Sequence, residues 1–165
     1  RSSAASDVYK RQIIYIVLAN TILMLCNVAG GFIIQHIFDI PMTISPIQAL
    51  CGTLCIILAS IWNIPLCLWF AKKMGVFATL ILNVGMSFML GTLGANTNFW
   101  FVCPYSWVTR LMVPTLRILP NGEPATGSAL STPLPLIIMT ICLSLVLLYI
   151  ISKLTAKSFT KQEVL

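Results

Sequence analysis

Residues 98–124 read NFWFVCPYSWVTRLMVPTLRILPNGEP, and the fold depends on whether this stretch crosses a membrane. Nine Phe, Val, Leu and Ile residues between positions 99 and 119 favour insertion by about 3 to 5 kcal/mol. Arg110 and Arg117 oppose insertion by about 2.5 to 3.5 kcal/mol each near the membrane centre. Pro104 and Pro114 interrupt the single long helix that a span requires. The balance predicts a segment that lies in the interface, or dips into the membrane and turns back.

The aromatic residues of this stretch suit the same depth. Trp100, Tyr105 and Trp107 have amphipathic rings, which are favourable between lipid headgroups and acyl chains. We therefore expect the two tryptophans to hold the segment from its apolar side, with Arg110 and Arg117 at the headgroups.

The composition of the 165-residue chain is that of an integral membrane protein. It is 58% hydrophobic and 8% charged, whereas soluble domains carry about 25% charged residues. In such a protein the placement of the lysines and arginines matters more than the net charge of +6. The charge is thus a guide to topology and makes no case for nucleic-acid binding.

Four apolar runs are long enough to span a bilayer, which takes about 20 residues each. They are residues 13–37, 47–70, 76–95 and 133–152. The fold class predicted is an all-α polytopic membrane protein with four transmembrane helices and an external interfacial or re-entrant segment, 97–132, before the last span. Asn63 and Pro65 predict a kink near the end of the second span.

The lysines set the predicted orientation. Lys72 and Lys73 form a short basic loop, and Lys153, Lys157 and Lys161 lie in the tail, residues 153–165. Two spans separate the loop from the tail, so both lie on one side, which the positive-inside rule assigns to the cytoplasm. Arg110 and Arg117 then lie outside, either in a functional segment or merely extended to lipid phosphates.

Residues 1–12, RSSAASDVYKRQ, are polar and end abruptly at Ile13. The part from Asp7 to Gln12 resembles the translation of a transposase end sequence used in preparing sequencing libraries; the alternative is a natural basic amino-terminus. We interpret the segment as non-native, with the true chain continuing upstream of Ile13.

Small residues mark candidate helix contacts within the spans, because they let backbones approach closely. The candidates are Gly30 and Gly31 in the first span, Ala49, Gly52 and Thr53 in the second, and Ser87, Gly91 and Ala95 in the third. The third set repeats every four residues and fits either a subunit interface or packing within this chain.

Ionisable groups in the spans are few. His36 and Asp39, three residues apart, could form a proton-linked pair, or simply cap a helix at the membrane edge. Cys51 and Cys55 share a helix face but lack His or acidic partners nearby, so we expect no metal site. We also expect no disulfide framework and no cofactor.

The arrangement and the motifs of the external stretch resemble a known family, the ABC-2-type permeases. The stretches concerned are Cys103-Pro104-Tyr105-Ser106-Trp107, Arg110-Leu111-Met112-Val113-Pro114 and Leu119-Pro120-Asn121-Gly122. They are similar to the last external connection of lantibiotic-immunity permease subunits, which carries an aromatic–Pro–Trp stretch, an Arg-Leu-Met, a Pro and a Pro-Asn-Gly. The likeness extends from about residue 13 to the tail. Members have six spans, so this chain would hold the last four and lack the cytoplasmic coupling segment.

The resemblance implies a transport subunit in a bacterial cell membrane, not an enzyme. Such permeases pair with a second permease, as a heterodimer here, and with ATP-binding subunits, and the assembly expels lantibiotic peptides from the membrane. The chain has no G-x-x-x-x-G-K-[ST] phosphate loop, so a partner must hydrolyse ATP. The resemblance also implies an external gate or substrate segment, made of Trp100, Pro104, Tyr105, Trp107, Arg110, Pro114, Arg117, Asn121 and Gly122.

Three other interpretations remain open. One is an ABC-2 exporter of another drug, a lipid or a polysaccharide. A second is an intramembrane enzyme using His36 and Asp39, although the spans offer no further Glu, Lys, Arg or His to complete such a site. The third is a small membrane scaffold without a transport role.

Overall fold

The computed structural model describes residues 2–39, 44–98, 100–119, 123, 125 and 133–160. Every element in these residues is a helix: α1 (Ser2–Ile37), α2 (Pro46–Ser60), α3 (Asn63–Met74), α4 (Val76–Ala95), the short 3-10 helix η1 (Trp100–Val102), α5 (Pro104–Leu116) and α6 (Leu134–Thr160). Within the described ranges, α1, α4 and α6 are long and apolar enough to cross a membrane, and α2 with α3 would make a fourth span if the bent pair is one crossing. The predicted all-α membrane protein is confirmed at this level.

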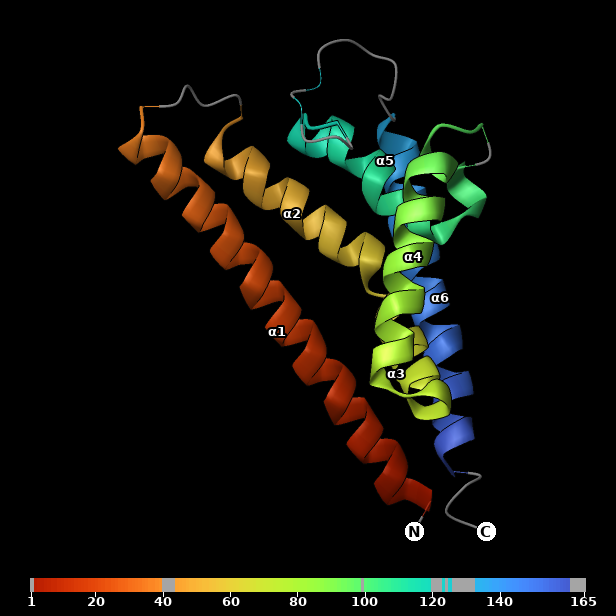
Figure 1. The fold of residues 1–165 in the computed structure, drawn as a ribbon. Coiled ribbons are helices and arrows are strands. Elements are labelled where there is room, and N and C mark those ends of the chain that lie inside the picture. The colour runs from red at the N-terminus through yellow and green to blue at the C-terminus, as the bar shows by residue number, and fades with distance from the viewer. Residues whose placement is uncertain are drawn as a thin grey trace.

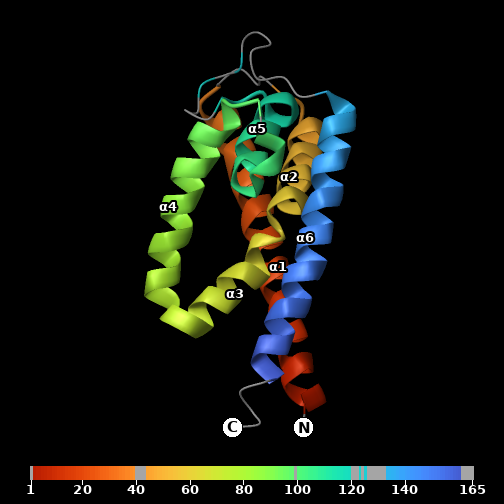
Figure 2. The same cartoon turned by 90° about the vertical axis from the view of Figure 1, so that its right-hand side faces the viewer.

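The chain passes back and forth between two ends of a bundle (Figure 1). The start of α1, the end of α6 and the turn from α3 to α4 lie toward one end, and the ends of α1 and α4 and the start of α6 lie at the other (Figures 1 and 2). The Lys72 Nζ atom, near the end of α3, donates to the Ser158 carbonyl oxygen, 2.7 Å away in α6. The predicted basic loop and basic tail therefore lie at the same end of the molecule.

Helix α1 begins eleven residues before the predicted span, at Ser2 instead of Ile13. Tyr9 is only 2% exposed, and its phenol interacts with Ser152 and Thr155 of α6. The segment interpreted as non-native is thus a helical extension of the first span. Its origin remains a prediction.

The predicted second span, residues 47–70, consists of two helices bent by 43° at Ile61 and Trp62. Pro65 has no N–H to donate to Ile61, whose carbonyl accepts instead from the Ile64 N–H at 3.3 Å. Helix α6 supports the break, because the Ser144 hydroxyl donates to the Leu58 carbonyl at 2.6 Å. The predicted kink near Asn63 and Pro65 is confirmed. The kink divides the apolar run of residues 47–70 into two separate helices, α2 and α3. Helix α3 continues beyond the predicted span to Met74.

The third span agrees with its predicted range, residues 76–95. Gly75, with a φ of 86°, makes the tight turn between α3 and α4, a conformation that other residues rarely adopt. The last span starts as predicted, but α6 continues to Thr160. Much of the predicted tail, residues 153–165, is therefore helical; positions 161–165 lie outside the described residues.

Candidate functional site around α5

The predicted external segment folds into the bundle. Helix α5 lies between α2 and α4, at the end of the bundle opposite the start of α1 and the end of α6 (Figure 2). Pro104 starts the helix, where its missing N–H costs nothing. The Ser106 hydroxyl lies 2.7 Å from both the Trp100 and the Cys103 carbonyl oxygens, which fixes the turn from η1 into α5. Whether the segment lies in the interface or dips into the membrane and turns back stays a prediction.

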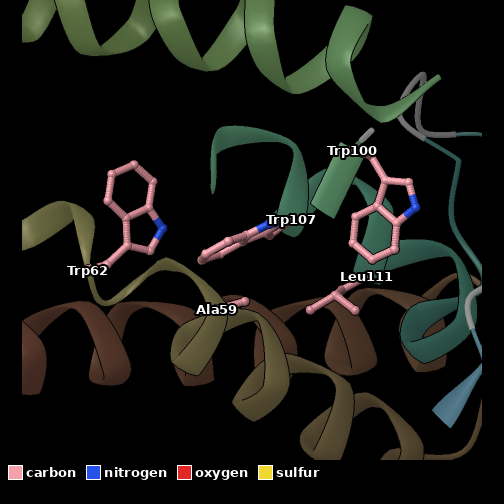
Figure 3. Packing of buried hydrophobic residues seen from close by; sticks show 5 residues of the cluster. All are labelled: Ala59, Trp62, Trp100, Trp107 and Leu111. Atoms are coloured by element: carbon pink, nitrogen blue, oxygen red, sulfur yellow. The ribbon is translucent and has the colours of Figure 1, made fainter. Parts of the chain in front are cut away.

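The tryptophans of this segment form an interior core (Figure 3). Trp100 is 6% exposed and Trp107 is 2% exposed, and they pack with Leu111, Ala59 and Trp62. The rings of Trp62 and Trp107 meet edge to face, 6.3 Å apart at 71°. The expectation that Trp100 and Trp107 hold the segment from its apolar side through ring contact with lipid is therefore wrong, because packing near the break between α2 and α3 removes both rings from the surface.

Arg110 is held within the bundle. Its Nη1 atom donates to the Ala95 carbonyl oxygen at 3.1 Å, and its guanidinium lies 5.5 Å from the Trp100 ring centre. Ala95 ends α4, where a cation complements the helix dipole. Its Nε atom is buried without a partner among the described residues, and burial lowers the pKa of the guanidinium from its usual value. Arg110 thus fastens the end of α4 to α5.

Arg117 lies in different surroundings. It caps α5 with a φ of 55°, and its N–H donates to the Val113 carbonyl at 3.0 Å. The side chain is exposed. Helix α5 does continue through Pro114, but it ends at Leu116, so Arg117 does not share a helical face with Arg110. The two arginines are not an equivalent pair.

Small residues permit the close approach of α5 to both neighbours. A Cβ atom at Gly91 would lie 3.3 Å from Thr109 Oγ1, and Ala95 is 1% exposed. On the other side, a Cβ atom at Gly52 would lie 2.6 Å from Leu116 Cδ2. Gly91 and Ala95 therefore serve packing within this chain, and the predicted contact residues of the second span, Ala49, Gly52 and Thr53, are all buried.

Ser87, the first residue of that repeat, is exposed and lines a cavity of about 190 Å³ with Pro104, Tyr105 and Thr109. Gly30 and Gly31 are different again, because a Cβ atom at either position would meet nothing within 4 Å. Within the described residues, neither glycine makes the close helix contact that the sequence predicted.

A polar network that the sequence did not reveal joins three elements. The Oδ1 atom of Asn83, in α4, accepts from Asn63 Nδ2 at 3.0 Å and from the Tyr105 hydroxyl at 3.2 Å. The signal that could have found it was a lone amide in the apolar run of α4, since such groups require partners in a membrane. Tyr105 thereby connects α5 to the helix break.

The remaining predicted candidates lie elsewhere. His36 and Asp39 are exposed at the end of α1. All six cysteines are free, and the described residues contain no cluster of three or more metal-binding side chains. Asn121 and Gly122 lie outside the described residues.

No protein-family model, curated protein or solved structure matches this chain.

Proposed function

We propose that this chain is the carboxy-terminal part of a membrane permease subunit of an ABC exporter, which expels lantibiotic peptides from the cell membrane and so protects the producing cell. A partner subunit binds and hydrolyses ATP, and a second permease completes the translocation path as a heterodimer. The membrane is that of a bacterial cell.

The observation that carries the proposal is the packing of α5. The residues that resemble the immunity permeases, among them Pro104, Trp107 and Arg110, are the residues that hold α5 between α2 and α4. A helix held there by an aromatic core and a partly buried cation can act as a gate at one end of a translocation path. An exposed interfacial helix would need neither.

The proposed topology counts the bent pair α2 and α3 as one span, which gives four crossings. Lys72, Lys73, Lys153 and Lys157 then lie toward the cytoplasm by the positive-inside rule. The carboxy-terminus is cytoplasmic, and α5 lies on the outer side, where a peptide leaving the outer leaflet would meet it.

The second candidate is an ABC-2 permease for another drug, a lipid or a polysaccharide. The same packing of α5 supports it equally, because nothing in α5 identifies the cargo. The two candidates predict that the cell becomes tolerant to different toxic compounds.

A tolerance assay in a sensitive bacterium tests the proposal. The full-length permease should raise tolerance to at least one of a panel of lantibiotics only when its ATPase and its second permease are expressed with it. The matched control is the same set with an ATPase that cannot hydrolyse ATP. Tolerance conferred by the present chain alone would contradict the proposal, and tolerance only to non-peptide drugs would favour the second candidate.

A further inference from the structure

A second cavity lies beside the break between α2 and α3, between α1 and the hairpin of α3 and α4, and shares Ser60 and Asn63 with the smaller cavity at α5. It measures about 610 Å³, within the range of ligand pockets, about 300 to 1,000 Å³. Its walls are one face of α1 and the hairpin of α3 and α4, and its lining residues are Ile16, Asn20, Met24, Ser60, Asn63, Ile64, Cys67, Leu68, Ala71, Val76, Thr79, Leu80 and Asn83. We call this cavity the amide groove.

The amide groove is open to the surroundings of the bundle. Of its lining residues, Ile16 is 38% exposed, Leu80 is 59% exposed and Val76 is 77% exposed. These helices are apolar enough to span a membrane, so what surrounds them is lipid hydrocarbon. A ligand would therefore enter from the bilayer and bring an apolar body with it.

The polar groups of the groove are of two kinds. The hydroxyls of Ser60 and Thr79 already donate to carbonyl oxygens of Ile57 and Gly75. The amides differ: Asn83 uses its Oδ1 atom for Asn63 and Tyr105, and its Nδ2 has no acceptor among the described residues.

Asn20 completes this polar set from the opposite wall. Its side chain forms no hydrogen bond within the described part of the chain, although it lies in an apolar helix. A polar group without a partner in hydrocarbon is costly. The amide of Asn20 and the Nδ2 atom of Asn83 can therefore hydrogen-bond with a ligand in the groove.

Charge defines what the groove excludes. None of the thirteen lining residues is ionisable except Cys67, which has no cationic or acidic neighbour in the lining. A carboxylate or an ammonium group would enter without a counter-ion, which is strongly unfavourable in an apolar site. An uncharged amide carries both a donor and an acceptor, which matches Asn20 and Asn83.

We propose that the amide groove is a binding site for a membrane-dissolved amphipathic molecule with an apolar chain and an uncharged amide group. The amide hydrogen-bonds with Asn20 and Asn83, and the chain lies against Ile16, Met24 and Leu80. Binding requires neither ATP nor a partner subunit, so its test is independent of the export proposal.

Photo-crosslinking in lipid nanodiscs tests the site with the full 165-residue chain. The probe is dodecanamide carrying a diazirine on its chain, and the matched probe is the corresponding dodecanoate. The amide probe should label residues of the groove on α1, α3 and α4, saturably, and an excess of plain dodecanamide should remove the labelling. The carboxylate should label at least fivefold less.

Substitutions on α1 sharpen the result. Asn20→Leu removes the free amide at nearly constant volume and should lower saturable labelling by about fivefold or more, since one charge-free hydrogen bond in an apolar site is lost. The control is Asn27→Leu, two turns along the same helix, where the amide already donates to the Leu23 carbonyl at 2.8 Å. Labelling of that variant should not change.

Four outcomes would overturn the proposal. They are labelling that does not saturate and spreads over the exposed faces of α4 and α6, equal labelling by the two probes, an Asn20→Leu variant that labels like the unsubstituted chain, and a groove that takes no probe in the full-length permease because another helix fills it. The comparison of the two probes uses the unsubstituted chain, so it holds even if Asn20→Leu fails to fold.

Discussion

The two ends of this bundle are built from similar apolar helices but are closed to different degrees. At the α5 end, Trp62, Trp100 and Trp107 fill the space between helices, and α5 approaches α2 at a glycine. At the other end, α1 stands against the α3 and α4 hairpin with amides and aliphatic side chains around a 610 Å³ cavity. Large rings and small contact residues leave a cavity of only about 190 Å³ at the α5 end, whereas medium-sized residues without rings leave more room.

The largest effect is expected from Trp107→Ala. The side chain is 2% exposed and its Nε1 donates to the Phe101 carbonyl at 2.9 Å. Removing a buried aromatic ring costs about 3 to 5 kcal/mol, so we expect a large loss of thermal stability in detergent, read from the unfolding midpoint. The control is Trp69→Ala, because Trp69 is only partly buried beside Phe70 and Lys73. Equal losses in both variants would mean that the α5 core is not specially packed.

A glycine comparison gives the next largest effect. Gly52→Ala places a methyl group 2.6 Å from Leu116 Cδ2, and overpacking costs about 1 to 3 kcal/mol. Gly30→Ala places a methyl group where nothing lies within 4 Å, and should be neutral or stabilise α1 by up to about 1 kcal/mol. Gly52→Ala should therefore lower the unfolding midpoint, whereas Gly30→Ala should leave it unchanged or raise it. A Gly52→Ala variant as stable as the unsubstituted chain would show that α2 and α5 are farther apart.

The stability changes of the two arginine substitutions should differ by less than those of the two glycine substitutions. Arg110→Gln loses the bond to the Ala95 carbonyl and the contact with Trp100, which we expect to cost about 1.5 to 3 kcal/mol. Arg117→Gln changes an exposed side chain and should cost less than about 0.5 kcal/mol. If the chain belongs to the proposed exporter, the first variant should also lower lantibiotic tolerance of the full-length protein, with assembly checked by pull-down. Identical behaviour of the two variants would restore the idea of an equivalent pair.

The elements that the sequence predicted well are those in which length and charge decide the result. The run at 76–95 is a spanning length between Gly75 and a polar segment, and its helix has the same bounds. The two charges and two prolines correctly excluded the stretch around Arg110 as an ordinary span. Pro65 likewise indicated the kink, because a missing N–H acts locally.

The site was less accessible from sequence, because its features depend on partners far along the chain. An amphipathic ring suits both a lipid interface and an aromatic core, so the sequence did not reveal that Trp100 and Trp107 are buried against other residues of the chain. Asn83 became important only through Asn63 and Tyr105, twenty or more positions away. Gly30 and Gly91 are both small residues in apolar spans, so the sequence predicts a helix contact at each. Only Gly91 contacts α5, and the sequence does not reveal the path of that helix.

Disulfide formation can test directly whether α5 packs against α2. A Cβ atom at position 52 would lie 3.2 Å from the Thr115 Cβ, close to the separation of about 3.5 to 4.5 Å found in disulfides. In a variant without the native cysteines, Gly52→Cys with Thr115→Cys should form an intramolecular disulfide on mild oxidation in membranes, whereas Gly30→Cys with Thr115→Cys should not. A Gly52 and Thr115 pair that stays reduced, or links no better than the Gly30 control, would contradict the packing of α5 within the bundle.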